Sequence, residues 1–163
     1  VESLFQYSLS NNGSVINYSG AERIDNKNFF ATNCDILIPA ALGNQITEQN
    51  AKDINAKLIA EGANGPTNVE GEKILLERGI SIIPDILCNS GGVIASYFEW
   101  LQNRNGELWQ MEEVIKKLEK KLNESFEKVF NYSKNNDTDL RTAAYCIAIE
   151  RIEKAYVQRG IFP

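Results

Sequence analysis

Histidine is absent from this sequence, and cysteine, methionine and proline are scarce. The 163 residues include three cysteines, one methionine and four prolines. Without histidine, the chain cannot form a Ser-His or Cys-His catalytic pair or a zinc finger, and we expect no metal site. The cysteines are far apart and lie in apolar surroundings: Cys34, Cys88 and Cys146. An odd number of such residues is typical of buried thiols in a reducing compartment, so we expect a cytoplasmic protein, with mitochondria or another organelle as alternatives.

Long apolar runs are missing too. No stretch approaches the roughly 18 residues of a membrane span, and the N-terminus lacks the charged and apolar regions of a signal peptide. The net charge of −5 argues against nucleic acid or an anionic membrane as a partner. The chain begins on Val1 instead of Met, so we expect it to be part of a longer protein.

The middle of the sequence does contain a regular alternation of short apolar strands and helices. The strands are predicted at CDILIP (34–39), at 57–60 and at 81–83. Thr47 is predicted to cap a short helix between the first two strands, and Thr67 a longer helix that ends near Arg78, with Gly79 directly after it. Connections of this length are typical of parallel βαβ units, so the carboxyl ends of the strands should meet at one edge of a sheet.

The rest of the chain has a helical pattern, apart from a short extended piece expected at Val15-Ile16. Helices are predicted over 2–10, 91–104, 111–130 and from about 139 onward. The third of these has apolar residues at spacings of three and four, which indicates one apolar face. The segment 143–149 is apolar all round, so we expect the last helix to be buried, either within this chain or beneath a missing part.

The stretch PDILCNSGGVIASYFEW (84–100) is the most informative one. Gly91 and Gly92 lie in the connection between the third predicted strand and the helix that follows it. Open α/β sheets bind ligands at such strand-to-helix connections. Paired glycines admit a ligand close to the backbone, and the N–H groups of a first helical turn favour an anion or a carbonyl oxygen. Alternatively, the glycines only relieve tight packing between helix and sheet. The motifs GxGxxG, GxxxxGK[ST] and HExxH are absent, so the pattern alone names no reaction.

Four segments carry a resemblance to a known family. They are DILIPAALGNQIT (35–47), AEGANGPT (60–67), GISIIPDILCNSGGVIASYFEW (79–100) and DLRTAAY (139–145). In their order and spacing they closely resemble the C-terminal half of glutamate dehydrogenases, in the family that also includes leucine, valine and phenylalanine dehydrogenases. The sequence departs from the family pattern at Gly43, where a larger polar residue is common, and at Cys88 and Ser90, where alanine is usual.

The resemblance implies an NAD(P)-dependent enzyme that converts L-glutamate reversibly to 2-oxoglutarate and ammonium. The implied α/β fold is the second half of a Rossmann-like, doubly wound parallel sheet in residues 1–104. A C-terminal helical segment, 105–163, would pack back on the sheet and toward a missing substrate domain. The catalytic lysine and aspartate and the glycine fingerprint would lie in the missing part, so we expect the chain alone to be inactive. The parent would be a homo-oligomer, a hexamer; the alternative is a non-catalytic assembly or regulatory half-domain.

The resemblance also implies site residues. The cofactor-binding residues would be Ala40, Ala41, Asn64 and Asn89, and the substrate-binding residues Val93 and Ser96. Each has a structural alternative. The two alanines could simply allow close packing, Asn64 could stabilise a turn, and Asn89 could be a helix N-cap. Val93 could be a core residue, and Ser96 could bond to its own helix. NAD and NADP are not distinguished, because the residue that contacts the 2′ position would lie on an earlier strand.

Overall fold

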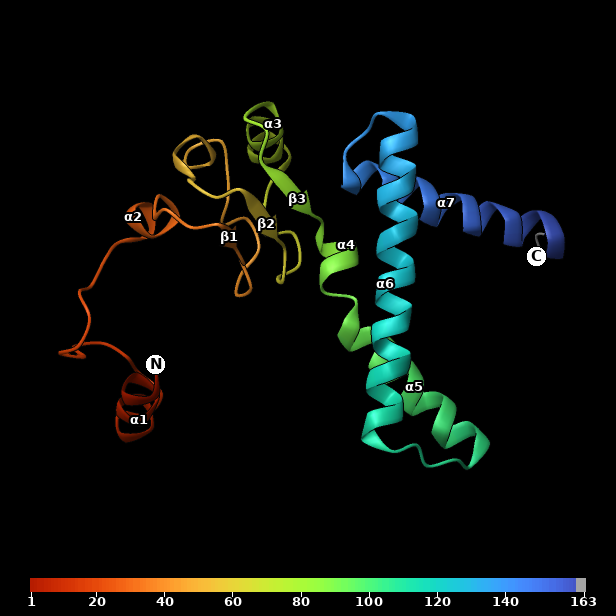
Figure 1. The fold of residues 1–163 in the computed structure, drawn as a ribbon, viewed down its shortest axis with the longest axis horizontal. Helices are drawn as coiled ribbons and strands as arrows, with labels where there is room; N and C mark the ends of the chain where they lie inside the picture. Colours follow the sequence, from red (N-terminus) through yellow and green to blue (C-terminus); the bar gives the residue numbers. More distant parts are fainter. Residues whose placement is uncertain (161–163) are drawn as a thin grey trace.

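The computed structural model describes residues 1–160 and places a small parallel sheet between helices (Figure 1). The strands are β1 (Ile36–Leu37), β2 (Leu58–Ala60) and β3 (Ser81–Ile83). Their order in the sheet is β1-β2-β3, and both pairs are parallel. The predicted fold class, three consecutive parallel strands of a Rossmann-like α/β sheet followed by helices, is confirmed.

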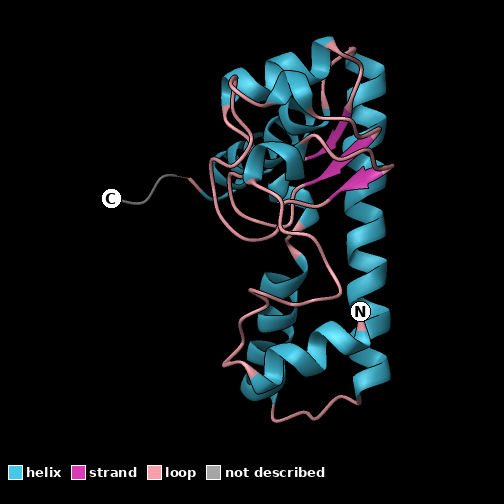
Figure 2. Cartoon of the chain, turned by 90° about the vertical axis from the view of Figure 1, so that its left-hand side faces the viewer, coloured by secondary structure: helices cyan, strands magenta, loops and turns pink. Residues whose placement is uncertain are grey.

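Helices precede, connect and follow the strands. They are α1 (Glu2–Ser10), α2 (Asn26–Phe30), α3 (Val69–Glu77), α4 (Asp85–Cys88), α5 (Gly91–Asn105), α6 (Met111–Asn136) and α7 (Leu140–Arg159), with a 3-10 turn η1 at Ala51–Asp53. The long helix α6 runs along one side of the molecule (Figure 2) and packs on both α5 and α7. Within residues 1–160, no helix has the length and apolar character needed to cross a membrane.

Two apolar clusters hold these elements together. Fully buried side chains between the sheet, α3 and η1 form the first, among them Ile46, Ile54, Ile59 and Leu75. The second joins α4, α6 and α7 through Leu87, Val129, Ala143 and Ala144. Each fully buried Ile or Leu contributes about 1.5–3 kcal/mol. Because Ile83 of β3 packs against the second cluster, the C-terminal helices lie against the sheet.

Both predicted helix caps between the strands are wrong. Asn68, not Thr67, caps α3, and its Oδ1 accepts a backbone N–H three residues further on at 2.7 Å. Thr67 is buried, and its backbone forms a parallel bridge with Ile46, so it belongs to an extended connection. The same bridge directly precedes Thr47. The helix predicted from Thr47 is therefore reduced to the single turn η1, which follows Asn50.

Three other expectations differ from the structure. Val15-Ile16 is not extended but enters a turn. The three cysteines are half-buried, unpaired thiols instead of fully buried ones. In α7, Ala143 is fully buried, whereas Tyr145 and Ile149 are 49% and 62% exposed. Only one face of α7 is therefore covered within residues 1–160.

Candidate functional site

The carboxyl ends of the three strands meet at one edge of the sheet, as predicted. The loop that follows β2, which we call the 61–66 loop, is bonded to the strand end on either side. Ala63 N–H donates to the carbonyl of Pro39 at 2.8 Å, and Glu61 N–H donates to the carbonyl of Ile83 at 3.1 Å. These backbone bonds bring the segments after β1, β2 and β3 together, and we call this region the strand-end edge.

Asn64 and Asn89 come from different connections and contact each other at this edge. Asn89 Nδ2 donates to Asn64 Oδ1 at 2.6 Å and to the Ala63 carbonyl at 3.3 Å. Within residues 1–160, the amide oxygen of Asn89 and the amide nitrogen of Asn64 make no hydrogen bond. One acceptor and one donor are therefore available to a ligand. Asn89 ends α4, and Ser90 occupies the N-cap position of α5, so the N-cap alternative for Asn89 is wrong.

Ala40 and Ala41 are exposed at the same edge. A Cβ added to Gly62 would lie 3.0 Å from the Cβ of Ala40, so this close approach of two strand ends favours glycine at position 62. Close packing therefore explains the side of Ala40 that faces Gly62. The other side of Ala40 and the side chain of Ala41 are small and exposed, so they leave the strand-end edge accessible to a ligand.

The two glycines at the start of α5 are not required by packing within residues 1–160. A Cβ on Gly92 would meet no atom within 4 Å, and one on Gly91 would lie at an ordinary contact distance, 3.9 Å, from Leu122. The tight-packing alternative is therefore wrong for this part of the chain. No side chain caps the first turn of α5. Within residues 1–160, Val93 is 75% exposed and belongs to neither apolar cluster, and Ser96 is exposed and makes no hydrogen bond to its own helix.

Arg141, on α7, lies next to this edge and was missed by sequence reasoning. Its guanidinium contacts three carboxylates: Nη2 lies 2.6 Å from Glu61, Nε 2.7 Å from Glu72 and Nη1 2.8 Å from Asp85. We call these four residues the Arg141 cluster. The side chain of Glu61 is fully buried, and those of the other three are no more than 19% exposed. The cluster joins α7 to the ends of β2 and β3 and to α3.

The charges of this cluster are set by burial and by local donors. Burial opposes ionisation of Asp85, but the N–H groups of Gly65 and of its own helix, with Arg141, lower the pKa of Asp85. Burial also opposes the charge of Arg141, yet Glu72 and Glu61 raise its pKa, so the guanidinium stays charged. In Glu72 burial prevails and raises the pKa despite Arg141.

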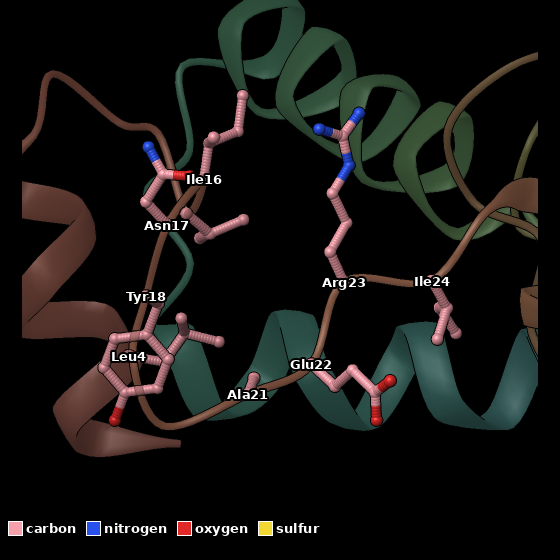
Figure 3. A pocket seen from close by; sticks show the side chains of 9 residues that line it. Leu4, Ile16, Asn17, Tyr18, Ala21, Glu22, Arg23 and Ile24 are labelled. Atoms are coloured by element: carbon pink, nitrogen blue, oxygen red, sulfur yellow. The ribbon is translucent and has the colours of Figure 1, made fainter.

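A cavity of about 400 Å³ lies elsewhere, between α1 and the loop that follows it (Figure 3). It is lined by Leu4, Val15, Ile16, Asn17, Tyr18, Ala21, Glu22, Arg23 and Ile24. None of the predicted site residues lines this cavity. The candidate site is therefore the strand-end edge.

The pattern of a known family extends over nearly the whole chain. The Glutamate/Leucine/Phenylalanine/Valine dehydrogenase family matches residues 1–160. The chain belongs to this family. Within it, the NAD-specific glutamate dehydrogenase of Staphylococcus aureus (strain COL) is 51% identical over 139 residues, which are 85% of this chain and 34% of that protein. The chain thus spans about a third of the length of the curated relatives it matches.

Solved structures of other family members have the same fold. The glutamate dehydrogenase from Peptoniphilus asaccharolyticus is 49% identical, with a TM-score of 0.73 over 77% of this chain and 32% of its own. The hetero-hexameric glutamate dehydrogenase from Thermus thermophilus, in its Leu bound form, is 28% identical, with a TM-score of 0.90 over 99% of this chain and 38% of its own. The predicted membership of the amino-acid dehydrogenase family is confirmed.

Proposed function

We propose that this chain is part of an NAD(P)-dependent glutamate dehydrogenase. The reaction would convert L-glutamate, water and NAD(P)⁺ reversibly to 2-oxoglutarate, ammonium and NAD(P)H with release of a proton. Family membership supports an amino-acid dehydrogenase. The name of the Staphylococcus aureus relative supports glutamate as the substrate, and NAD over NADP as the cofactor.

The observation that carries this proposal is the Asn64–Asn89 pair beside the uncapped first turn of α5. Together with the small exposed residues after β1, these groups fit one wall of a dinucleotide site. The cofactor, when bound, supplies the hydride acceptor. The free amide groups of Asn64 and Asn89 would hold the nicotinamide ribose side. Further along α5, the exposed Val93 and Ser96 would contact the substrate.

The other wall would be supplied by a part of the protein outside these 163 residues. The chain spans about a third of its relatives, which leaves room for a substrate domain with the catalytic lysine and aspartate, and for the glycine fingerprint. The sheet supports this proposal, because β1 is an edge strand and Ile36 and Ile38 are 54% and 61% exposed. In such a protein, residues 1–104 would complete the nucleotide-binding domain, and 105–163 would extend toward the substrate domain.

The proposed assembly and the proposed compartment each rest on a single observation. The Thermus thermophilus neighbour is named a hetero-hexamer, which supports a six-subunit assembly, here as a homo-hexamer. The three unpaired thiols support a reducing compartment such as the cytoplasm.

The test is an assay of the complete protein that contains this sequence. It should reduce NAD⁺ or NADP⁺ in the presence of glutamate, as followed by absorbance of the reduced nicotinamide. Replacing Asn89 with alanine should weaken cofactor binding about tenfold, since a buried or ligand-facing hydrogen bond of this kind contributes about 1.4 kcal/mol. Oxidation of leucine, valine or phenylalanine instead of glutamate would leave the family intact and contradict the substrate. Absence of turnover with all four amino acids would favour the alternative, a non-catalytic half-domain.

A further inference from the structure

We infer that Asp85 and Arg141 are positioning residues that hold the 61–66 loop, and through it Asn64, at the cofactor edge. This inference rests on the proposed function, because it takes the Asn64–Asn89 pair as part of the cofactor site. Neither Asp85 nor Arg141 would touch the ligand. Each would act through hydrogen bonds to the residues that do.

The link from Asp85 to the amide pair is a closed ring. Asp85 Oδ2 accepts the N–H of Gly65 at 2.8 Å, and Gly65 directly follows Asn64. Asn64 accepts from the side chain of Asn89 at 2.6 Å, and the backbone N–H of Asn89 donates to the Asp85 carbonyl at 3.1 Å. Asp85 therefore holds both asparagines, one through the loop and one through the single turn of α4.

The 61–66 loop needs such a restraint at Gly65. This glycine has a φ of +52°, and a Cβ there would meet no atom within 4 Å. Packing therefore does not hold it, and glycine is the residue with the greatest conformational freedom. On its other side only the carbonyl is held, by Asn44 N–H at 2.8 Å. The carboxylate of Asp85 is thus the sole acceptor of the Gly65 N–H within residues 1–160.

Arg141 helps to fix the orientation of that carboxylate. Its Nη1 donates to Asp85 Oδ1, which also accepts the N–H of Ile86 at 2.8 Å, and the two bonds leave Oδ2 directed at Gly65. Its Nη2 donates to Glu61 Oε2, the same oxygen that accepts the backbone N–H of Asp85 at 2.9 Å. The planar guanidinium can make these bonds together with the one to Glu72, which a lysine ammonium cannot match in geometry. A residue of the last helix is therefore connected to the cofactor edge.

The experiment compares Asp85→Asn with a matched control, Asp139→Ala, in the complete protein. An asparagine presents one oxygen, so it cannot accept from both Gly65 and Arg141. Asp139 caps the helix that carries Arg141 and accepts from the N–H and the hydroxyl of Thr142. Within residues 1–160, no hydrogen bond joins its side chain to the 61–66 loop, so its loss weakens the start of α7 without breaking a bond to that loop. Two quantities are measured: amide hydrogen exchange of residues 61–65 without cofactor, and the Kd for NAD⁺ and NADP⁺.

We expect Asp85→Asn to speed exchange in the 61–66 loop about tenfold and to raise the cofactor Kd about tenfold. Asp139→Ala should change both by less than about twofold, although it lowers Tm. Arg141→Lys, a milder variant that keeps the charge, should give an intermediate increase in both quantities and serves if Asp85→Asn does not fold. Unchanged exchange and Kd in both the Asp85 and Arg141 variants, or equal increases in Asp139→Ala, would overturn the inference.

The same measurements distinguish failure of the proposed function from failure of the positioning role. If the wild-type complete protein binds neither dinucleotide, the cofactor proposal is wrong, while the amide exchange of residues 61–65 still reports whether Asp85 holds the loop. If the wild type binds dinucleotide and Asp85→Asn leaves loop exchange unchanged, the cofactor proposal stands and the positioning role is wrong.

Discussion

At the scale of single residues, Asp139 is a helix cap whose contribution should depend on pH. Its Oδ1 accepts the N–H of Thr142 at 2.8 Å, and its Oδ2 accepts the Thr142 hydroxyl at 2.7 Å. Asp139→Ala removes both bonds and should lower the free energy of unfolding by about 1 kcal/mol at pH 7. Burial opposes ionisation, but the bonds from Thr142 lower the pKa of Asp139.

The sign of the pH dependence follows from that lowered pKa. A carboxylate whose folded pKa lies below its unfolded value, about 3.9 for aspartate, contributes stability above that value and loses it as the pH falls through the folded pKa. The difference in Tm between wild type and Asp139→Ala should therefore be full at pH 7 and shrink below about pH 4. A difference that stays constant down to pH 3 would show that the charge of Asp139 plays no part.

Ser96 is the residue for which the family resemblance implies the sharpest consequence. Its exposed hydroxyl lies one helical turn after Val93, on the helix that begins at the open glycine pair. In the complete enzyme, we predict that it donates to the side-chain carboxylate of glutamate. Such a bond contributes roughly 1.5–3 kcal/mol, so Ser96→Val should lower kcat/KM for glutamate about tenfold to a hundredfold and improve the relative use of norvaline.

The control for Ser96→Val is Ser96→Thr, which has the same branched shape and keeps the hydroxyl. It should retain most of the glutamate activity. If Ser96→Val stays within about twofold of wild type while folding normally, Ser96 does not select the substrate.

At the scale of elements, the Arg141 cluster should stabilise the contact of α7 with the sheet. Arg141→Met would leave the fully buried carboxylate of Glu61 beside Glu72 and Asp85 without a cation. Breaking a buried pair in this way costs about 3–5 kcal/mol. The matched control is Lys57→Met, since Lys57 and Asp35 pair at a similar 2.7 Å but are 84% and 79% exposed.

Urea unfolding should distinguish the buried Arg141 cluster from the exposed Lys57–Asp35 pair. Lys57→Met should cost no more than about 1 kcal/mol, because water screens an exposed pair. Equal losses in the two variants would mean that the Arg141 cluster does not hold α7 to the sheet.

The elements that the sequence predicts well are those with local signals. The apolar spacing of α6 and the Asn105-Gly106 break after α5 are visible within a few turns, and both helices form, although α6 continues past the predicted end at residue 130 to Asn136. Arg141 has no such signal, because its partners lie 80, 69 and 56 residues away. Its position in the DLRTAAY segment marks the family without showing what it binds. The cap of α3 is one residue later than predicted: Thr67 pairs through its backbone with Ile46, and it is the side chain of Asn68 that accepts the N–H of Gly71.

At the scale of the whole molecule, the described residues form one side of a site and leave several apolar surfaces uncovered. The edge of β1 exposes Ile36 and Ile38, and the outer face of α7 exposes Ile149 and Tyr156. Both surfaces fit contacts with the rest of a longer protein, since large apolar areas that face water cost free energy. The expectation that α7 is buried on all sides within this chain is therefore wrong for residues 1–160. The other alternative, that a missing part of the protein covers its outer face, stays a prediction.

The 163-residue chain on its own should therefore neither turn over glutamate nor bind dinucleotide tightly. The strand-end edge offers the free amide groups of Asn64 and Asn89, but half of a doubly wound sheet provides only one wall of the crevice. The glycine loop that anchors the pyrophosphate would belong to the other half. Calorimetric titration should give no submicromolar Kd for NAD⁺ or NADP⁺, and glutamate should produce no steady increase in reduced cofactor. The complete protein under the same conditions is the positive control. Submicromolar binding by the isolated chain would place most of the cofactor affinity at the strand-end edge and contradict this division of the site.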